Sequence, residues 1–212
     1  PNAIGFNLMD RHDLGIHTEQ IGASMARMIQ RGVVTNRYKN LDKGWSVGAF
    51  IIADNFTYEY LNNHPRVMMR RGRYTNDPMI IAQQDNMVSI TAALQIDLTG
   101  QVAAEAIGHI QWSGTGGATD FAYGAYHAPG GKGIIAINAT AKHGTISRIV
   151  PQLKPGAVVS ISRNIVDYIV TEYGIAKLRG KTIAQRVEEL INVAAPEFRE
   201  ELRKQARELK LR

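Results

Sequence analysis

The sequence contains no cysteine at all. This absence excludes disulfide bonds, a cysteine nucleophile, thiolate zinc sites and iron–sulfur clusters. It is also typical of a reducing compartment, and we expect a cytoplasmic protein. Long hydrophobic runs are lacking too, because the longest apolar stretches, such as residues 47–53, fall far short of the ~20 residues that cross a bilayer. We therefore expect no membrane span and no membrane partner.

The charge balance is moderately basic. Among 212 residues there are 25 Lys and Arg and 19 Asp and Glu, a formal net charge of +6, and 44% of the residues are hydrophobic. The hydrophobic content predicts a globular protein with a real core. The positive charge suits a polyanion, such as nucleic acid or a phosphorylated cofactor, and equally a basic solvated surface. Because no basic block is interleaved with aromatic residues, we expect no nucleic-acid partner.

Hydrophobic periodicity predicts an α/β fold with a mostly parallel sheet flanked by helices. Ile21, Met25, Met28 and Ile29 recur at helical spacing and predict a helix over residues 20–30. Short apolar runs predict buried strands at residues 47–53, 80–82, 88–96, 133–137, 157–161 and 167–170. Further helices are predicted at residues 55–62, 118–125, 182–194 and 196–211. Thr182 is the predicted N-cap of the third of these helices.

The chain carries no internal repeat, low-complexity tract or linker rich in Pro and Ser, which favours a single domain over residues 1–212. It opens with Pro1-Asn2-Ala3 and without an initiator methionine. We interpret it as part of a longer polypeptide.

Generic cofactor motifs fit poorly. In the glycine-rich segment 113–120, Thr119 stands where the third glycine of a dinucleotide-binding motif belongs. Segment 130–133 resembles half of a phosphate-binding P-loop, but Tyr126 replaces its first glycine and Gly133 its Ser or Thr. The six histidines are scattered, and His12 and His17 are five residues apart where helical metal ligands are four apart. We expect no metal site.

Glu19 follows an extended apolar stretch and directly precedes the helix predicted from Gln20. A carboxylate at that point would face the positive end of the helix, which favours its ionised form and keeps it ready as a nucleophile. The alternative is ordinary helix chemistry, because a glutamate in a first helical turn contributes about 0.3 to 1 kcal/mol of stability.

Several blocks, in the same order, are similar to the C-terminal half of the acetyl-CoA hydrolase/transferase family. This family includes 4-hydroxybutyrate, butyryl-CoA:acetate and succinyl-CoA:acetate CoA-transferases, and the resemblance runs from about Asp13 to Glu201. The blocks are 13–19 (DLGIHTE), 74–78 (YTNDP), 97–102 (DLTGQV), 113–117 (SGTGG) with Asp120-Phe121, 147–151 (SRIVP) and 170–180 (VTEYGIAKLRG). The resemblance implies a CoA-transferase-like C-terminal domain over residues 1–212, whose N-terminal half is absent from this chain.

The resemblance assigns the nucleophile to Glu19. In the family, this glutamate attacks an acyl-CoA thioester and becomes a glutamyl-CoA thioester through mixed anhydrides, so that the thioester energy is conserved. It also implies that Gly116 or Gly117 donates a backbone N–H to the oxyanion of the tetrahedral intermediate. A tight turn that leads into the helix from Ala118 is the alternative for the two glycines.

The remaining site residues also come from the resemblance. Asn76 matches an asparagine that positions the acyl or carboxylate group, and Glu172 matches a second active-site glutamate. A turn former before Pro78 and a helix-start residue before Tyr173 are the respective alternatives. The expected CoA-binding residues, which could equally be solvated side chains, are Lys132, Lys142 and Arg148.

We therefore expect a CoA-transferase that moves CoA between an acyl-CoA and a small carboxylic acid. The alternatives are an acetyl-CoA or other acyl-CoA hydrolase that uses the same glutamate, and a noncatalytic CoA-binding domain when this half stands alone. The resemblance implies coenzyme A as substrate without a metal, the N-terminal half as partner, and a homo-oligomer. Ala118-Thr119 follows the double glycine where many relatives have Gln, so the acyl substrate is not copied from any one relative.

Overall fold

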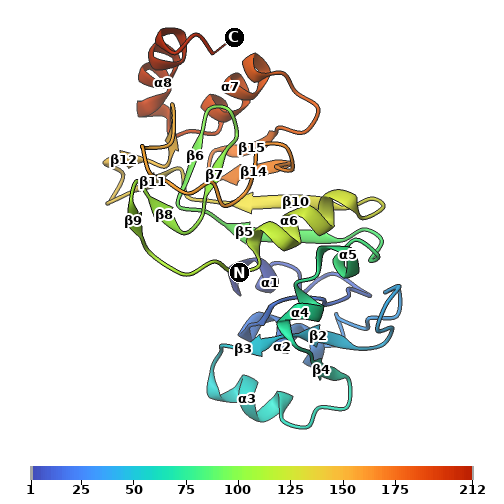
Figure 1. Ribbon diagram of the computed structural model, residues 1–212. Coiled ribbons are helices and arrows are strands. Elements are labelled where there is room, and N and C mark those ends of the chain that lie inside the picture. Colours follow the sequence, from blue (N-terminus) through green and yellow to red (C-terminus); the bar gives the residue numbers. More distant parts are fainter. Residues whose placement is uncertain (1, 212) are drawn as a thin grey trace. The chain divides into compact units, whose positions relative to one another are not determined.

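The structure is a computed structural model, of which residues 2–211 are described (Figure 1). The chain divides into two compact units. The first contains the residues up to Met87 together with His127–Gly131, and the second contains Val88–Tyr126 and the residues from Lys132 onward. The sequence favoured one domain because no linker marks a boundary, yet the boundary falls directly at the start of a strand. The assignment of the whole chain as one C-terminal domain stays a prediction.

The first unit is built from short helices and two-stranded parallel sheets. Strand β1 pairs with β3, and β2 pairs with β4. Apolar side chains of α2, among them Met28 and Ala26, are buried in two small hydrophobic clusters. In chain order the elements are α1 (Asn2–Phe6), β1 (Gln20–Ile21), α2 (Ala23–Gln30), β2 (Ser46–Gly48), β3 (Phe50–Ile51), α3 (Asn55–Leu61), β4 (Val67–Met69), α4 (Gly72–Thr75) and α5 (Pro78–Ile81).

Three predictions for this unit need correction. The helix predicted over 20–30 begins only at Ala23, because Gln20 and Ile21 pair as a strand with β3. The predicted strand 47–53 is split at Ala49, since β2 and β3 pair with different partners. Residues 80–82 are not a strand: Ile80 and Ile81 end helix α5, which Asp77 caps and Pro78 opens, and Ala82 is its C-cap.

The second unit contains a four-stranded sheet in the order β15-β14-β10-β5. Strands β5 (Val88–Ala92), β10 (Lys132–Ala136) and β14 (Tyr168–Thr171) are parallel, and β15 (Gly174–Lys177) is an antiparallel edge. The helices of this unit are α6 (Ala118–His127), whose last residue alone belongs to the first unit, α7 (Ile183–Asn192) and α8 (Pro196–Glu208). The shorter strands are β6 (Gln95–Asp97), β7 (Val102–Ala103), β8 (Ala106–Ile107), β9 (Ile110–Gln111), β11 (Thr140–Ala141), β12 (Ile146–Ser147) and β13 (Ile149–Val150).

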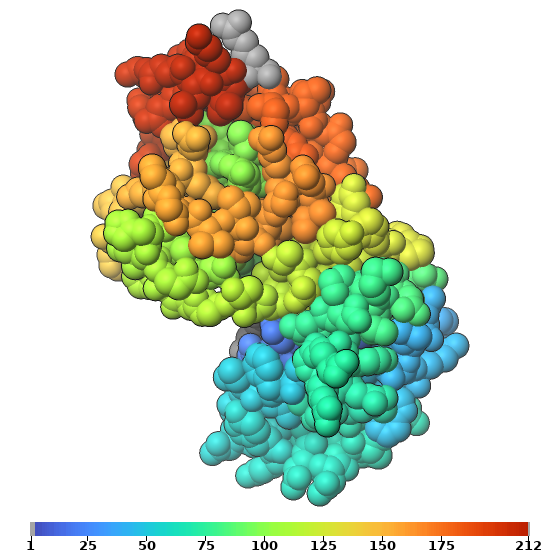
Figure 2. All heavy atoms as spheres, viewed as in Figure 1, coloured from blue at the N-terminus to red at the C-terminus, as the bar shows by residue number. Residues whose placement is uncertain are grey.

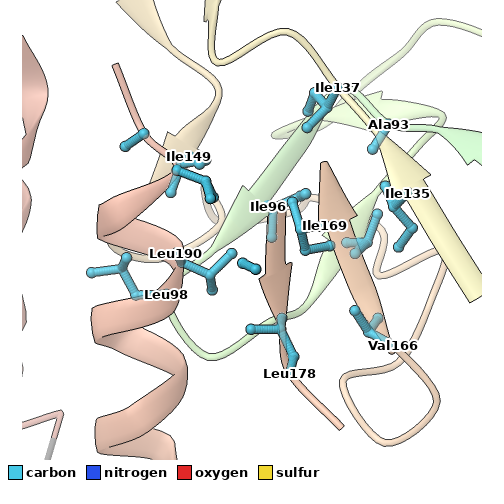
Figure 3. Close-up of a cluster of buried hydrophobic side chains, with 14 of the residues drawn as sticks. Ala93, Ile96, Leu98, Ile135, Ile137, Ile149, Val166, Ile169, Leu178 and Leu190 are labelled. Carbon is cyan, nitrogen blue, oxygen red and sulfur yellow. The ribbon is translucent and has the colours of Figure 1, made fainter. Parts of the chain in front are cut away.

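The core of the second unit joins the sheet to its helices. Figure 3 shows Ile96 of β6, Ile169 of β14 and Leu190 of α7 in one cluster of buried apolar side chains. Leu202 and Ala206 of α8 belong to the same cluster, and in Figure 2 this helix is the red segment beside the orange one that contains α7. Burial of this apolar surface is the main force that holds the helices in place.

The predicted α/β class with a mostly parallel sheet is confirmed. The helices predicted at 55–62, 118–125, 182–194 and 196–211 are all present, with ends that differ by up to three residues. The strands predicted at 133–137 and 167–170 differ from β10 and β14 by one residue at each end. Residues 88–96 instead form β5 and part of β6. Residues 157–161 form no strand, because only Ile161 makes an isolated bridge, to Val102.

Candidate active site

Glu19 lies on an extended segment of the first unit whose backbone is held by β2 and β3. The N–H of Thr18 donates to the Val47 carbonyl at 3.0 Å, and the Glu19 carbonyl accepts from the N–H groups of Ala49 at 2.8 Å and Phe50 at 3.1 Å. The segment lies close to β2: a Cβ on Gly48 would come within 2.6 Å of Ile21 Cγ1. The Glu19 backbone is therefore held by hydrogen bonds to β2 and β3. The prediction that Glu19 directly precedes a helix is wrong, because β1 follows it and α2 begins only at Ala23.

Asn76 is brought to Glu19 by helix α4. Its own N–H donates to the Gly72 carbonyl at 2.8 Å, which closes the single helical turn and makes Asn76 the C-cap. The side-chain Nδ2 then donates to Glu19 Oε1 at 2.9 Å. Two predicted site residues that are 57 positions apart thus share a hydrogen bond, and the half-buried Glu19 carboxylate has a fixed donor.

His17 forms a second link between the same two segments. His17 lies two residues before Glu19 and makes an isolated parallel bridge to Val47 of β2. His17 Nε2 lies 2.9 Å from the Thr75 carbonyl oxygen, and because a carbonyl only accepts, Nε2 carries the hydrogen. His17 and Glu19 therefore contact two consecutive residues, Thr75 and Asn76.

Burial lowers the pKa of His17 below its ordinary value, although the hydrogen bond to Thr75 opposes the shift. The nearby charge of Lys39 lowers the pKa of His17 further. Lys39 Nζ donates to the carbonyls of Ile16 at 2.9 Å and Trp45 at 2.7 Å, and burial lowers the pKa of Lys39 to about 8. His17 is consequently neutral at neutral pH. A neutral ring can donate to the buried Thr75 carbonyl without placing an uncompensated charge in the interior.

Sequence reasoning did not find His17, Thr75 or Lys39 as parts of this site. His17 was weighed as a metal ligand and otherwise appeared, like Thr75, only inside a motif block. The one available signal was that His17 shares a block with Glu19 and Thr75 shares a block with Asn76.

Glu172 lies in the second unit, in the two-residue turn that joins β14 to β15. The helix-start alternative is therefore wrong: Thr171 pairs with Gly174, whose φ of 142° suits glycine. Glu172 Oε2 accepts from the N–H of Ala139 at 2.8 Å. This contact places the carboxylate where β10 and β14 end, and the carboxyl edge of parallel strands is where α/β folds bind ligands.

Arg148 lies at the same edge. The backbone N–H of Arg148 donates to the carbonyl of Ala139, and the N–H of Ala139 in turn donates to Glu172. The Nη1 atom of the Arg148 side chain lies 3.4 Å from the carbonyl oxygen of Ala93, which follows β5. Within the described residues, the buried Arg148 Nε has no hydrogen-bond partner. Arg148 and Glu172 therefore both bind the backbone of Ala139, Arg148 through its own N–H and Glu172 through its carboxylate.

The three predicted CoA-binding residues do not gather in one place. Lys142 is exposed in the turn between β11 and β12, with a left-handed φ of 48°. Lys132 is the first residue of β10 and lies at the amino edge of the sheet, opposite to Glu172 and Arg148. A single phosphate group at one edge would not contact both Lys132 and Arg148.

The two candidate glycines stand directly before α6. Gly117 is buried and its carbonyl accepts from the N–H of Phe121 at 2.9 Å, as in a helical turn, whereas Gly116 is exposed. The first N–H groups of a helix lack partners within the helix, so they are suited to bind a developing oxyanion. Their proposed role stays a prediction.

Within residues 2–211, no group of three or more His, Asp or Glu side chains could hold a metal ion. No helix in the same range is long and apolar enough to cross a membrane.

Comparison with known proteins gives a consistent set of relatives. Residues 54–206 match the acetyl-CoA hydrolase/transferase C-terminal domain. The chain is 47% identical over 209 residues to the succinyl-CoA:cyclohexane-1-carboxylate CoA transferase of Geobacter metallireducens, with 99% of this chain and 48% of that protein covered. It is 46% identical over 202 residues to the 4-hydroxybutyrate coenzyme A transferase of Clostridium kluyveri, with 95% of this chain and 47% of the relative covered.

Solved structures agree. RipA from Yersinia pestis superposes with a TM-score of 0.95 at 46% identity, covering 100% of this chain and 48% of RipA. The 4-hydroxybutyrate CoA-transferase of Porphyromonas gingivalis superposes with a TM-score of 0.85 at 39% identity, covering 99% of this chain and 49% of that one. The chain thus spans about half the length of the curated relatives it matches.

Proposed function

The chain belongs to the acetyl-CoA hydrolase/transferase C-terminal domain family, and from this premise we propose that the polypeptide containing it is a CoA-transferase. It moves CoA between an acyl-CoA and a small carboxylic acid, with Glu19 as the covalent carrier. We also propose that it needs the N-terminal half present in its relatives, and that it is a cytoplasmic homo-oligomer.

The observation that carries this proposal is the hydrogen bond from Asn76 Nδ2 to Glu19 Oε1. A carboxylate must be held in one orientation to attack a thioester efficiently, because positioning contributes much of the rate enhancement. An amide donor provides that orientation without neutralising the negative charge. The relatives are named CoA-transferases for several different acids, which supports the class of reaction and leaves the substrate open.

The proposed chemistry proceeds in two balanced halves. In the first half, Glu19 attacks the acyl carbon of the acyl-CoA and the C–S bond breaks. CoA departs as a thiolate, and an acyl-glutamyl anhydride forms. The thiolate then attacks the glutamyl carbon, which gives glutamyl-CoA and the free donor carboxylate. In the second half, the acceptor carboxylate attacks glutamyl-CoA and expels the thiolate, which attacks the acceptor acyl carbon and restores Glu19.

The roles of the other predicted residues remain part of the proposal. Gly116 or Gly117 would donate an N–H to the oxyanions of these steps, and their place before α6 is the supporting feature. Glu172 would act as the second glutamate of the site. Lys132, Lys142 and Arg148 would contact CoA; Arg148 has the strongest support because its buried Nε lacks a partner in the described structure.

The test is to measure thioester loss by the complete polypeptide, N-terminal half included, with and without added acetate, butyrate or succinate. We expect CoA transfer to at least one acid, its loss in Glu19→Gln, and unchanged transfer in the exposed control Glu59→Gln on α3. CoA release at a rate indifferent to every acid would instead indicate a hydrolase. Tight CoA binding without turnover would indicate a noncatalytic CoA-binding protein.

A further inference from the structure

We propose that Thr75 is a positioning residue for Glu19 that acts through Asn76, an inference that rests on the function proposed above. Thr75 is fully buried at the end of α4. Its Oγ1–H donates to Asn76 Oδ1 at 2.9 Å, and Asn76 Nδ2 donates to Glu19 Oε1 at the same distance. The three side chains form a chain of hydrogen bonds that ends on the carboxylate.

The orientation of the Asn76 amide decides whether this chain helps the carboxylate. An ionised carboxylate only accepts hydrogen bonds, so it needs Nδ2 on its side; Oδ1 in that place would set two acceptors against each other. The Thr75 hydroxyl favours the productive orientation because it supplies a hydrogen to Oδ1. If the amide turned over, that hydrogen could still go to the Gly72 carbonyl, which at 3.5 Å is a much weaker acceptor position.

His17 keeps Thr75 in place from the other side. Its Nε2–H donates to the Thr75 carbonyl at 2.9 Å, and both groups are buried. Because His17 lies two residues before Glu19 on the same extended segment, this bond ties the position of Thr75 to the backbone that carries the carboxylate. Thr75 is thus fixed through its carbonyl and orients Asn76 through its hydroxyl.

The experiment compares Thr75→Val, which keeps the shape and removes the hydroxyl, with Thr75→Ser, which keeps the hydroxyl. In the complete polypeptide we expect Thr75→Val to lower kcat for CoA transfer about threefold to tenfold, the factor for one hydrogen bond, with KM unchanged. Thr75→Ser should stay within about twofold of the parent, since the same bond is available to it. Thr75→Ala serves the same comparison if the valine variant does not fold.

Two controls separate positioning from mere stability. Thr57→Val in α3 removes another fully buried hydroxyl, which donates to Asp54 Oδ1 at 2.6 Å, and should leave kcat unchanged. In an Asn76→Ala background, Thr75→Val should lower kcat no further, because its effect passes through Asn76.

Two results would overturn the proposal even though Glu19→Gln stays inactive. In the first, Thr75→Val lowers kcat in the Asn76→Ala background by the same factor as in the parent. In the second, kcat of Thr75→Val equals that of the parent. Full transfer by Glu19→Gln would overturn the proposed function, and this inference with it.

Discussion

At the scale of single residues, the candidate site depends on groups that hold a carboxylate without cancelling its charge. Asn76 donates to Glu19, and the buried His17 and Thr75 support the turn that presents Asn76. Each group is neutral at neutral pH, so the charge of the carboxylate remains available for the proposed attack on a thioester. The candidate site therefore orients Glu19, the proposed nucleophile, chiefly through hydrogen bonds.

Removal of the amide donor measures its contribution directly. Asn76→Ala should lower kcat for CoA transfer about tenfold to a hundredfold, because hydrogen bonds to charged groups are worth about 1.5–3 kcal/mol. Steady-state kinetics of the complete polypeptide check this, with Asn62→Ala as the matched control, since Asn62 is the exposed C-cap of α3. A kcat for Asn76→Ala equal to that of the parent would remove Asn76 from the site.

The buried His17 predicts a pH dependence of stability. Its pKa is lowered below 6.5 in the folded state, so as pH falls through 6.5 the unfolded chain takes up a proton first and the free energy of unfolding decreases. His17→Gln keeps a side-chain donor for the Thr75 carbonyl and cannot titrate. Between about pH 8 and about pH 5, the variant should therefore lose less stability than the parent.

Urea unfolding followed by the fluorescence of Trp45, in a Trp112→Phe background, reports on the first unit; the sequence has two tryptophans. Parallel pH curves for the parent and His17→Gln would contradict the account of His17 as a buried neutral group.

Which of these residues could be predicted depends on how far apart their contacts lie in the sequence. Glu19 and Asn76 were named because each belongs to a motif block, but their hydrogen bond spans 57 positions and no local pattern encodes it. The contact of His17 with Thr75 spans 58 positions and was missed for the same reason. Motifs identified the residues, and only the fold shows which of them meet.

At the scale of elements, hydrophobic runs located β10 and β14 to within one residue, and a local capping signal located the start of α7. Thr182 was predicted as an N-cap, and it forms a reciprocal capping box with Gln185 at the start of α7. The run at 80–82 was misjudged because three apolar residues fit either a strand or a helix, whereas Asp77-Pro78 before it is a helix-start signal. The helix from residue 20 was misjudged because strand pairing outweighed helical spacing at its first residues.

The capping box supplies a stability prediction for the second unit. Thr182→Ala should lower the free energy of unfolding by about 1 kcal/mol, because the N–H of Gln185 in the first turn of α7 loses its side-chain acceptor. Thr182→Ser keeps the acceptor and should restore most of that loss. Urea unfolding followed by Trp112, in a Trp45→Phe background, measures both variants; an unchanged midpoint in Thr182→Ala would show that the capping bonds contribute nothing.

At the scale of the whole molecule, the chain forms two compact units and matches about half of each curated relative. The match to the family begins at residue 54, so Glu19 lies outside it, although the relatives align over nearly the entire chain. The candidate residues divide between the units: Glu19 and Asn76 belong to the first, and the glycines, Glu172 and Arg148 to the second. Because the chain covers only about half of each relative, the activity measurements use the complete polypeptide.

The most direct measurement traps the covalent carrier. The complete polypeptide is incubated with an acyl-CoA, treated with borohydride or hydroxylamine, digested, and mapped by mass spectrometry. A glutamyl-CoA thioester predicts a modification at Glu19 that requires the acyl-CoA and is absent from Glu19→Gln. An enzyme that transfers CoA while Glu19 stays unmodified, or carries the modification on another residue, would contradict the account.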